Sequence, residues 1–388
     1  MGDPGWYTAD DCRVEDLDAL VRAGTDSAEY PAAAAVECGV LIYDGARLTA
    51  ASADPVARRA LMSELTRALM DGPGVLVLAG AYPDTAVVDD VTEAFGRIIA
   101  EEKSAGTAPG DHFAEAGAND RVWNALEKLA VADPDAFVRY YANPLIALVC
   151  EAWLGAGYQM TSQVNQVNPG GRAQSPHRDY HLGFQPQSAA ESYPAHVHRL
   201  SPALTLQGAV AHCDMPLESG PTLFLPHSQK YAPGYVAWHL PQFRSYFADH
   251  HVQVPLKKGD VVFFNPALIH AAGENRTSDV KRMANLLQVS SPFGRTMETI
   301  DRERVVCAVY PALLRARAGG MSHDELLHVI ASSAEGYAFP TNLDRDQPSG
   351  SDAPASQAEL VRDALAQQWS LAVLAARLAD YSATRLSH

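Results

Sequence analysis

The spacing of hydrophobic residues before residue 158 is mostly that of helices with one buried face. In residues 54–69, leucines recur every fourth position after Asp54-Pro55, a pair typical of a helix N-cap and the first helical residue. In residues 88–98, apolar side chains follow a similar spacing and predict a second helix. The apolar run Val75–Leu78 between them predicts a buried strand. We therefore expect a mostly helical N-terminal flank.

A shorter pattern around residue 44 predicts a hairpin. Residues 39–43 (GVLIY) and residues 46–49 (ARLT) flank the pair Asp44-Gly45. Because Asp-Gly readily adopts the backbone angles of a two-residue turn, we expect two antiparallel strands here.

From residue 158 to residue 294 the pattern changes to short β-rich segments separated by proline and glycine. These segments read MTSQVNQVN, LTLQGAVAH, PTLFLP, VVFFNP and MANLLQVSS. Strands at such spacing are typical of an antiparallel sandwich or jelly roll, and not of parallel βαβ units. No P-loop and no GxSxG nucleophile motif occurs among them. The predicted fold class is mainly β with flanking helices.

The C-terminal part of the chain is predicted to be helical again. Residues 340–355 (PTNLDRDQPSGSDAPA) are polar and rich in proline, serine and aspartate, as is typical of a linker. Ser356 with Glu359 three residues later matches a capping box. It predicts one final helix that continues through Leu378, whose apolar stripe we expect to pack against the rest of the protein.

One elaborated domain accounts for these patterns. Residues 1–157 form its N-terminal flank, residues 158–294 its jelly-roll core and residues 295–388 its helical C-terminal extension. A large β core with helical decoration can absorb 388 residues without a second core. With 47% hydrophobic and 20% charged residues, the composition is that of an ordinary globular protein.

The charge balance disfavours anionic partners. The chain has 30 Lys+Arg and 46 Asp+Glu, a formal net charge of −16, which repels nucleic acids and anionic membranes. The N-terminus has no secretory signal, and no apolar run approaches the roughly 20 residues that cross a bilayer. Five cysteines without a CxxC pair favour reduced thiols. We expect a cytoplasmic protein that binds neither nucleic acid nor membrane.

The candidate chemistry lies in the core segment. His177 and Asp179 are two residues apart, so in an extended segment both side chains point to the same face and can reach one metal ion. His212 and Asp214 repeat the same spacing, so at least one of the two copies is coincidental. Two histidines and one carboxylate on one face of a metal are the ligand set of non-haem Fe(II) oxygenases.

His270 and Arg282 complete the candidate site. His270 ends the segment VVFFNPALIH and can supply the third ligand from across the barrel. Arg282 lies 12 residues later, on the next predicted strand. Its planar set of donors suits the far carboxylate of a 2-oxoacid better than a lysine would. The sequence therefore predicts an iron site with a 2-oxoglutarate anchor.

Three motifs and the arginine downstream of them resemble the phytanoyl-CoA dioxygenase family of Fe(II)/2-oxoglutarate oxygenases. The motifs are NPGGRAQSPHRD, SGPTLFLPHSQK and KKGDVVFFNPALIH. The resemblance runs from about Gly74 to Gly294. It implies a double-stranded β-helix core of the jelly-roll, cupin-like kind, and often a homodimer. It also implies Fe(II), 2-oxoglutarate and O2 as cofactor and cosubstrates.

The form PGGxxQxxHRD resembles a subgroup that includes fungal meroterpenoid and alkaloid oxygenases. In that subgroup four side chains contact 2-oxoglutarate, and by motif they correspond to Gln174, Thr222, Arg282 and Arg121. The chain departs from the family at His227-Ser228-Gln229, where Gly-Ser-His is common, and in a longer, histidine-rich segment 185–199. Neither departure changes a ligand, so they bear on the substrate and not on iron binding.

The predicted activity is oxidation, with hydroxylation as the expected outcome, of a C–H bond in a small, largely apolar metabolite of natural-product biosynthesis. The alternatives are a cupin-like metal-dependent isomerase or hydrolase that does not use 2-oxoglutarate, and a non-catalytic binding protein. Arg282 has an alternative role in a salt bridge with Asp279 or Glu274, and Gln174 and Thr222 can simply satisfy loop backbone groups.

Other polar residues of the core are open at this point. His181 shares the face of the two proposed ligands and is expected near the substrate or behind the metal ligands. Some of four polar residues on predicted strands are expected to line the barrel interior: Gln163, Asn165, Asn285 and Gln288. The remaining histidines of the core are expected at the surface or in the hydrophobic core.

Overall fold

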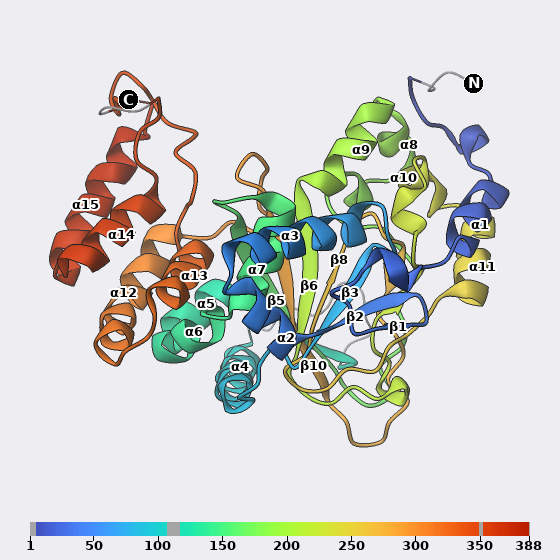
Figure 1. Cartoon of the computed structure of the whole chain (residues 1–388), viewed down its shortest axis with the longest axis horizontal. Coiled ribbons are helices and arrows are strands. Elements are labelled where there is room, and N and C mark those ends of the chain that lie inside the picture. Colours follow the sequence, from blue (N-terminus) through green and yellow to red (C-terminus); the bar gives the residue numbers. More distant parts are fainter. Residues whose placement is uncertain (1–4, 107–116, 349–351, 388) are drawn as a thin grey trace.

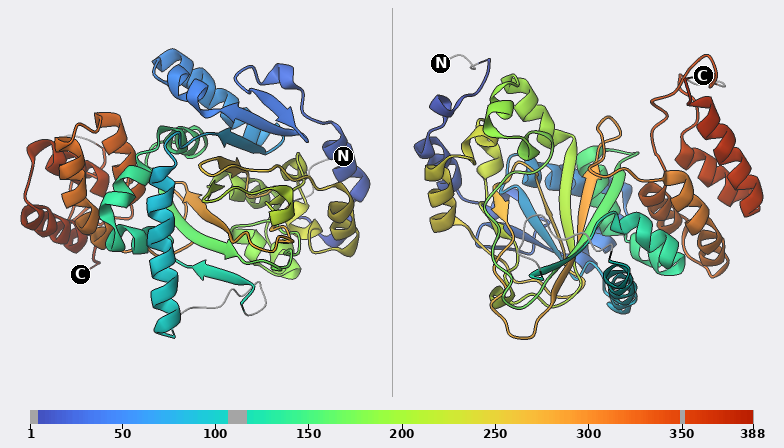
Figure 2. Two further views of the ribbon diagram at one scale, coloured as in Figure 1. Left: turned by 90° about the horizontal axis from the view of Figure 1, so that it is seen from below. Right: turned by 180° about the vertical axis from the view of Figure 1, so that it is seen from behind.

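The computed structural model describes residues 5–106, 117–348 and 352–387 (Figures 1 and 2). Helices and strands are interspersed up to residue 167, the remaining strands lie between residues 205 and 290, and helices follow to the C-terminus. No helix in these ranges is long and apolar enough to cross a membrane.

Eight strands form the major sheet, with the order β1-β2-β3-β8-β6-β10-β5-β4. Their bounds are β1 (Ala35–Glu37), β2 (Val40–Asp44), β3 (Val75–Ala79), β4 (Asn119–Val122), β5 (Gln159–Val167), β6 (Thr205–Ala211), β8 (Val261–Phe264) and β10 (Arg282–Ser290). All neighbours are antiparallel except β2 and β3. Four of these strands precede residue 158, so the N-terminal flank contributes directly to the sheet. The single-domain organisation stays a prediction.

A small second sheet lies across the cavity from the major sheet. It consists of β7 (Leu223–Phe224) and β9 (His270–Ala271), and single bridges join it to neighbouring segments at His177 and Val252. The two sheets together form the expected double-stranded β-helix core. Helices nevertheless hold more residues than strands, so the description "mainly β" applies to this core only.

The alternation of side chains along β3 shows how the core is divided. Leu76 and Leu78 join the large hydrophobic cluster beneath the helices, whereas Val75 and Val77 join a smaller cluster between the sheets. Successive side chains of a strand point to opposite faces, so one strand serves both clusters. The major sheet is therefore buried on both faces, and its inner face is available for a site.

Helices cover the outer face and both ends of the core. Helices α3, α5, α7 and α13 pack on the major sheet, helices α12–α15 gather at one end, and α1 packs with α11 at the other (Figure 1). The helices are α1 (Val14–Arg22), α2 (Gly45–Ser52), α3 (Pro55–Met70), α4 (Ala86–Ser104), α5 (Ala125–Ala132), α6 (Pro134–Tyr141), α7 (Pro144–Leu154), α8 (Gln187–Glu191), α9 (Ala195–Ala203), α10 (Gly234–Ala237), α11 (Pro241–His250), α12 (Arg302–Ala318), α13 (His323–Ser333), α14 (Gln357–Gln367) and α15 (Leu371–Thr384).

The helices predicted over residues 54–69 and 88–98 are present as α3 and α4, and Asp54 caps α3 by accepting a hydrogen bond from the Ala57 amide.

The predicted hairpin at Asp44-Gly45 is wrong. The Asp44 carboxylate accepts a 2.9 Å hydrogen bond from the Arg47 amide and starts helix α2 there. Strand β2 finds its partner on β3 instead, so the aspartate acts as an N-cap and not as a turn residue.

The predicted final helix is two helices. Ser356 and Glu359 form the expected capping box at the start of α14. Gln368 then adopts a left-handed conformation with φ 55°, and Ser370 caps α15 by accepting a hydrogen bond from the Val373 amide. The apolar stripe continues because both helices pack against the same hydrophobic cluster. Of the predicted linker 340–355, residues 349–351 lie outside the described residues.

Candidate metal centre

His177 and His270 lie directly opposite each other on two antiparallel segments. The His177 amide donates to the His270 carbonyl (2.9 Å), and the His270 amide donates to the His177 carbonyl (3.1 Å). In such a pair both side chains project to the same face. Each Nδ1 lies within hydrogen-bonding distance of a backbone carbonyl, that of Ser175 at 2.8 Å for His177 and that of Leu268 at 2.9 Å for His270. These bonds fix Nδ1 as the donor and leave both Nε2 lone pairs for a metal.

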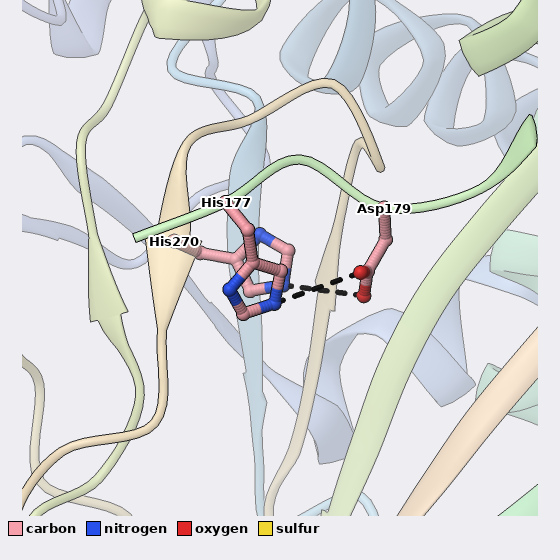
Figure 3. Close-up of side chains that lie close together, drawn as sticks. All are labelled: His177, Asp179 and His270. Atoms are coloured by element: carbon pink, nitrogen blue, oxygen red, sulfur yellow. Dashed lines mark ion pairs between the residues drawn. The ribbon is translucent and has the colours of Figure 1, made fainter. Parts of the chain in front are cut away.

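Asp179 brings a carboxylate to the two imidazoles. Its amide donates to the Pro266 carbonyl (3.1 Å), which keeps residues 177–179 alongside the segment that leads to His270. Oδ1 lies 3.6 Å from Nε2 of His177, and Oδ2 lies 3.5 Å from Nε2 of His270. The three ligand atoms lie within 4.8 Å of one another (Figure 3). This spacing allows one ion to contact all three groups.

The charge states of these groups suit a divalent metal. Burial lowers the pKa of His177 below its ordinary value in spite of the nearby Asp179, so this imidazole is neutral near pH 7. Burial opposes ionisation of Asp179, but the two histidines and Gln207 together lower the pKa of its carboxyl group. The ligand set is a carboxylate and two imidazole nitrogens, and it fits non-haem Fe(II).

The second His-x-Asp copy does not form a metal site. His212 is buried, with Thr92 Oγ1 2.8 Å from its Nδ1 and Tyr140 Oη 2.8 Å from its Nε2. Both ring nitrogens are therefore engaged. Asp214 accepts a hydrogen bond from the Lys258 amide at 3.0 Å. Among the described residues, only His177, Asp179 and His270 form a group that meets the geometry of a metal site.

A cavity of about 920 Å³ opens beside the triad and contains Arg282. The guanidinium Nη1 donates to the carbonyls of Ser219 (3.1 Å) and Gly273 (3.2 Å), which hold one edge of the group in place. Burial lowers the pKa of Arg282 to about 10, so the side chain is still cationic at neutral pH. Within the described part of the chain Arg282 forms no ion pair, so the alternative salt bridge with Asp279 or Glu274 is absent.

The other three residues proposed to contact 2-oxoglutarate also line this cavity. Gln174 Oε1 accepts a 3.3 Å hydrogen bond from the Ala272 amide, so this side chain supports the backbone, and its NH2 group is available to donate to a ligand. Thr222 lies at the cavity wall next to β7. Arg121, on β4, places its guanidinium 4.9 Å from the centre of the Trp123 ring. Their contacts with a cosubstrate stay predictions.

Alternating residues of the central strands line the cavity. Gln163 and Asn165 of β5 and Gln288 of β10 face it, whereas Asn285 points to the outer face and donates to Tyr140 Oη at 3.2 Å. Gln207 of β6 also faces the cavity and was not singled out from the sequence. An amide side chain in the mostly apolar run LTLQGAVA is the pattern that identifies it.

His181 does not line the cavity, although it was expected near the substrate or the ligands. Tyr180 and His181 both have positive φ angles, 61° and 39°, which break the strand alternation directly after Asp179. The His181 ring instead places Nδ1 3.0 Å from Ser201 Oγ. His181 therefore supports the chain that follows the metal ligands.

The chain matches one family model, described as phytanoyl-CoA dioxygenase (PhyH), over residues 70–284. This match covers more than half of the chain and includes His177, Asp179, His270 and Arg282. No curated protein matched the chain.

Several solved structures are weakly similar to this chain. The α-ketoglutarate-dependent non-haem epimerase SnoN from nogalamycin biosynthesis is 22% identical, with 62% of this chain and 84% of that chain covered and a TM-score of 0.40. The carbocyclase SnoK from the same biosynthesis is 20% identical, with 61% and 86% covered and a TM-score of 0.43. AviO1 from Streptomyces viridochromogenes Tue57 is 17% identical, with 60% and 95% covered and a TM-score of 0.43. The family match carries the assignment.

Proposed function

This chain belongs to the phytanoyl-CoA dioxygenase family of Fe(II)- and 2-oxoglutarate-dependent oxygenases, and we propose that it hydroxylates a C–H bond of a small, largely apolar metabolite. The observation that carries the proposal is the meeting of His177, Asp179 and His270 at the wall of a cavity that also holds the Arg282 guanidinium. In a metal-dependent isomerase or hydrolase that does not use 2-oxoglutarate, Arg282 would have no 2-oxoacid partner.

The residues of the site have separate tasks. His177 and His270 would hold Fe(II) through Nε2 and Asp179 through a carboxylate oxygen, while the bonds to Nδ1 keep both rings in place. Arg282 would bind the far carboxylate of 2-oxoglutarate through the part of its guanidinium that does not contact the Ser219 and Gly273 carbonyls. Fe(II) with 2-oxoglutarate and O2 supplies the oxidising equivalents for cleavage of a C–H bond. The protein's part is to orient these groups and to limit water around them.

The cavity lining supports a neutral, largely apolar substrate. Among the described residues that line it, the only ionisable side chains besides the metal ligands are Arg282 and Arg121. The other polar side chains are mostly neutral amides. Large apolar side chains face the same space, among them Trp123, Phe184, Trp238, Phe264 and Met297. Pockets with apolar walls and a few polar anchors are typical of sites for small metabolites. Both arginines are proposed to contact 2-oxoglutarate, and no lysine is among the described lining residues, so the phosphates of a coenzyme A thioester would lack further cationic partners there.

A role in natural-product biosynthesis is supported by the segment PGGRAQSPHRD, which contains the first two proposed ligands and Gln174. This segment resembles the biosynthetic subgroup of the family more than the acyl-CoA hydroxylases. The volume of the cavity, about 920 Å³, is near the upper end of the range for small-molecule sites, so it has room for a multi-ring substrate beside 2-oxoglutarate.

The test is succinate formation from 2-oxoglutarate by the full-length protein with Fe(II) and ascorbate, first alone and then with a pool of neutral metabolites. We expect slow succinate formation without substrate and faster formation with a substrate, together with a product heavier by one oxygen atom. His177→Ala is the matched variant, because it removes one metal ligand and leaves the backbone pairing with His270 in place.

Two outcomes would overturn the proposal. Equal succinate formation by wild type and His177→Ala would show that the triad is not the reaction centre. A product of unchanged mass, or one lighter by two hydrogens, would show that the site directs the oxidation elsewhere than to hydroxylation.

A further inference from the structure

Gln207 is the residue that contacts the proposed ligand Asp179 from the major sheet. It lies on β6 and faces the cavity, and its side chain is almost fully buried, with 3% of the residue exposed. Its Nε2 donates to Oδ2 of Asp179 and lies 3.5 Å from Oε1 of Gln288. Gln288 is its register partner on β10, so the sheet places these two amides side by side.

The orientation of the Gln207 amide is determined by these two acceptors. Both hydrogens of its NH2 group are directed at oxygens, one of Asp179 and one of Gln288. The reverse orientation would bring the amide oxygen against a carboxylate. In the observed orientation Oε1 of Gln207 is buried and has no hydrogen-bond partner within the described residues. A buried acceptor without a partner costs free energy. We attribute this orientation to the other end of the amide, where the NH2 group donates to Asp179 and Gln288.

We propose that Gln207 is a positioning residue that holds Oδ2 of Asp179 and thereby presents Oδ1 to the metal. Oδ1 lies 3.6 Å from Nε2 of His177 and receives no hydrogen bond from Gln207. Oδ2 lies 3.5 Å from Nε2 of His270, but one of its lone pairs is occupied by the Gln207 amide, so Oδ1 is the oxygen left free for the metal. A carboxylate that binds through one oxygen leaves more of the metal's positions for 2-oxoglutarate and O2 than one that binds through both. This inference rests on the metal site of the proposed function, and it adds a residue to which no role has been assigned.

Gln288 acts in this arrangement through Gln207. Its Oε1 receives the second N–H of Gln207 and so hinders rotation of that amide. Gln288 faces the cavity, next to the space for substrate. A substrate that touches Gln288 would therefore be linked to the Asp179 carboxylate through two amides.

The experiment is titration of Co(II) into the metal-free full-length protein under anaerobic conditions, followed by calorimetry and by the visible spectrum of the bound ion. Gln207→Met keeps the length of the side chain and removes the donor. We expect its Kd for Co(II) to rise about 10- to 100-fold, as is common when a residue behind a metal ligand is lost. We also expect a changed Co(II) spectrum, because Asp179 is no longer held through Oδ2.

Gln163→Met is the matched control, because Gln163 is another glutamine of the cavity wall and its side-chain amide donates to Sδ of Met297 and not to Asp179. It should keep the wild-type affinity and spectrum. Gln288→Met should weaken Co(II) binding less than Gln207→Met does. The double variant Gln207→Met/Gln288→Met should have the same Kd for Co(II) as Gln207→Met, because Gln288 acts only through Gln207. Far-UV circular dichroism and thermal melting establish that each variant is folded, and Gln207→Asn replaces Gln207→Met if the latter is not.

A folded Gln207→Met protein with the wild-type Kd and Co(II) spectrum would overturn the inference, as would an equal loss in Gln163→Met. Co(II) binding requires no turnover, so these results are independent of succinate formation. If the wild type binds Co(II) but forms no succinate, the proposed function fails and the role of Gln207 stands. If the wild type forms succinate and Gln207→Met binds Co(II) normally, the proposed function stands and the role of Gln207 fails.

Discussion

His177 and His270, far apart in the sequence, are joined by two reciprocal backbone hydrogen bonds of 2.9 and 3.1 Å. Their relative position is therefore set by the backbone, and it does not require a bound metal. Because Nδ1 of each ring is also bonded to a carbonyl, both Nε2 atoms are directed toward Asp179 (Figure 3). The site is thus preorganised, and a ligand can be removed without removing the pairing.

His270→Ala should strongly weaken metal binding while the fold remains. Loss of a residue behind a metal ligand typically lowers metal affinity by roughly 10- to 100-fold. We expect the affinity for Fe(II) or Co(II) to fall by at least this factor, because here a ligand itself is lost. The melting temperature of the metal-free protein should change little, since the bridge uses backbone atoms. Calorimetry and thermal melting measure the two effects. His181→Ala is the control, because its ring contacts Ser201 and not the triad; a similar loss of metal there would contradict the assignment.

Arg282→Lys should raise the KM for 2-oxoglutarate and leave metal affinity nearly unchanged. The substitution keeps the charge and loses the planar donor set, and the loss of a charge-assisted hydrogen bond of about 1.5–3 kcal/mol corresponds to roughly 10- to 100-fold. The measurement is succinate formation against 2-oxoglutarate concentration, with Co(II) calorimetry alongside. Lys281→Leu, at the exposed neighbouring position, should leave the KM unchanged. An unchanged KM in Arg282→Lys would show that this cation binds something else.

Gly234→Ala should destabilise the protein and disturb the metal site. An added Cβ would lie 1.9 Å from Cζ of Arg178, whose buried guanidinium donates to the carbonyls of Ser228 (2.5 Å) and Tyr231 (3.0 Å). Arg178 stands between His177 and Asp179 in the chain, so its displacement moves both ligands. We expect the free energy of unfolding to fall by about 1–3 kcal/mol, as is typical of overpacking.

The control for that substitution is Gly96→Ala in helix α4, where an added Cβ meets no atom within 4 Å. Alanine is favoured over glycine in a helix by about 1 kcal/mol, so this variant should be as stable as the wild type or more so. Denaturant unfolding of both variants, with Co(II) titration, is the measurement. A Gly234→Ala protein of wild-type stability would show that Arg178 can move freely.

His212 should make the protein sensitive to acid. Burial lowers its pKa from 6.5 to about 3, so between these values the unfolded chain binds a proton that the folded chain does not. The stability contribution of the neutral ring is complete above pH 6.5 and is lost as the pH falls toward 3, by at most about 1.4 kcal/mol per pH unit. His212→Asn should therefore lower stability at pH 8 but flatten its decline below pH 6.5.

The measurement is denaturant unfolding of the metal-free protein at several pH values, and the quantity compared is the slope of unfolding free energy against pH. His196→Asn is the control, because His196 is exposed and should leave the slope unchanged. If His212→Asn and wild type lose stability in parallel, the buried His212 ring is not a source of the acid sensitivity.

Local sequence patterns were sufficient for the helices α3 and α4, the strand β3 and the capping box of α14, because each depends on spacing or capping within a few residues. They failed at Asp44-Gly45, where the same two residues suit a turn or a helix N-cap. The pairing of β2 with β3, some thirty residues later, decides between them. A local pattern cannot include that partner.

The sequence by itself determined the kinds of ligand, their family and their spacing within His177–Asp179, since residues two apart in an extended segment share a face. The motif resemblance favoured this pair over His212 and Asp214. The tertiary structure showed the physical reason, because both ring nitrogens of His212 are engaged with Thr92 and Tyr140. It also showed Gln207 behind Asp179, a contact between β6 and a loop that no spacing along the chain contains. Chemistry follows from residue type and near neighbours, whereas the selection of a site follows from contacts between distant segments.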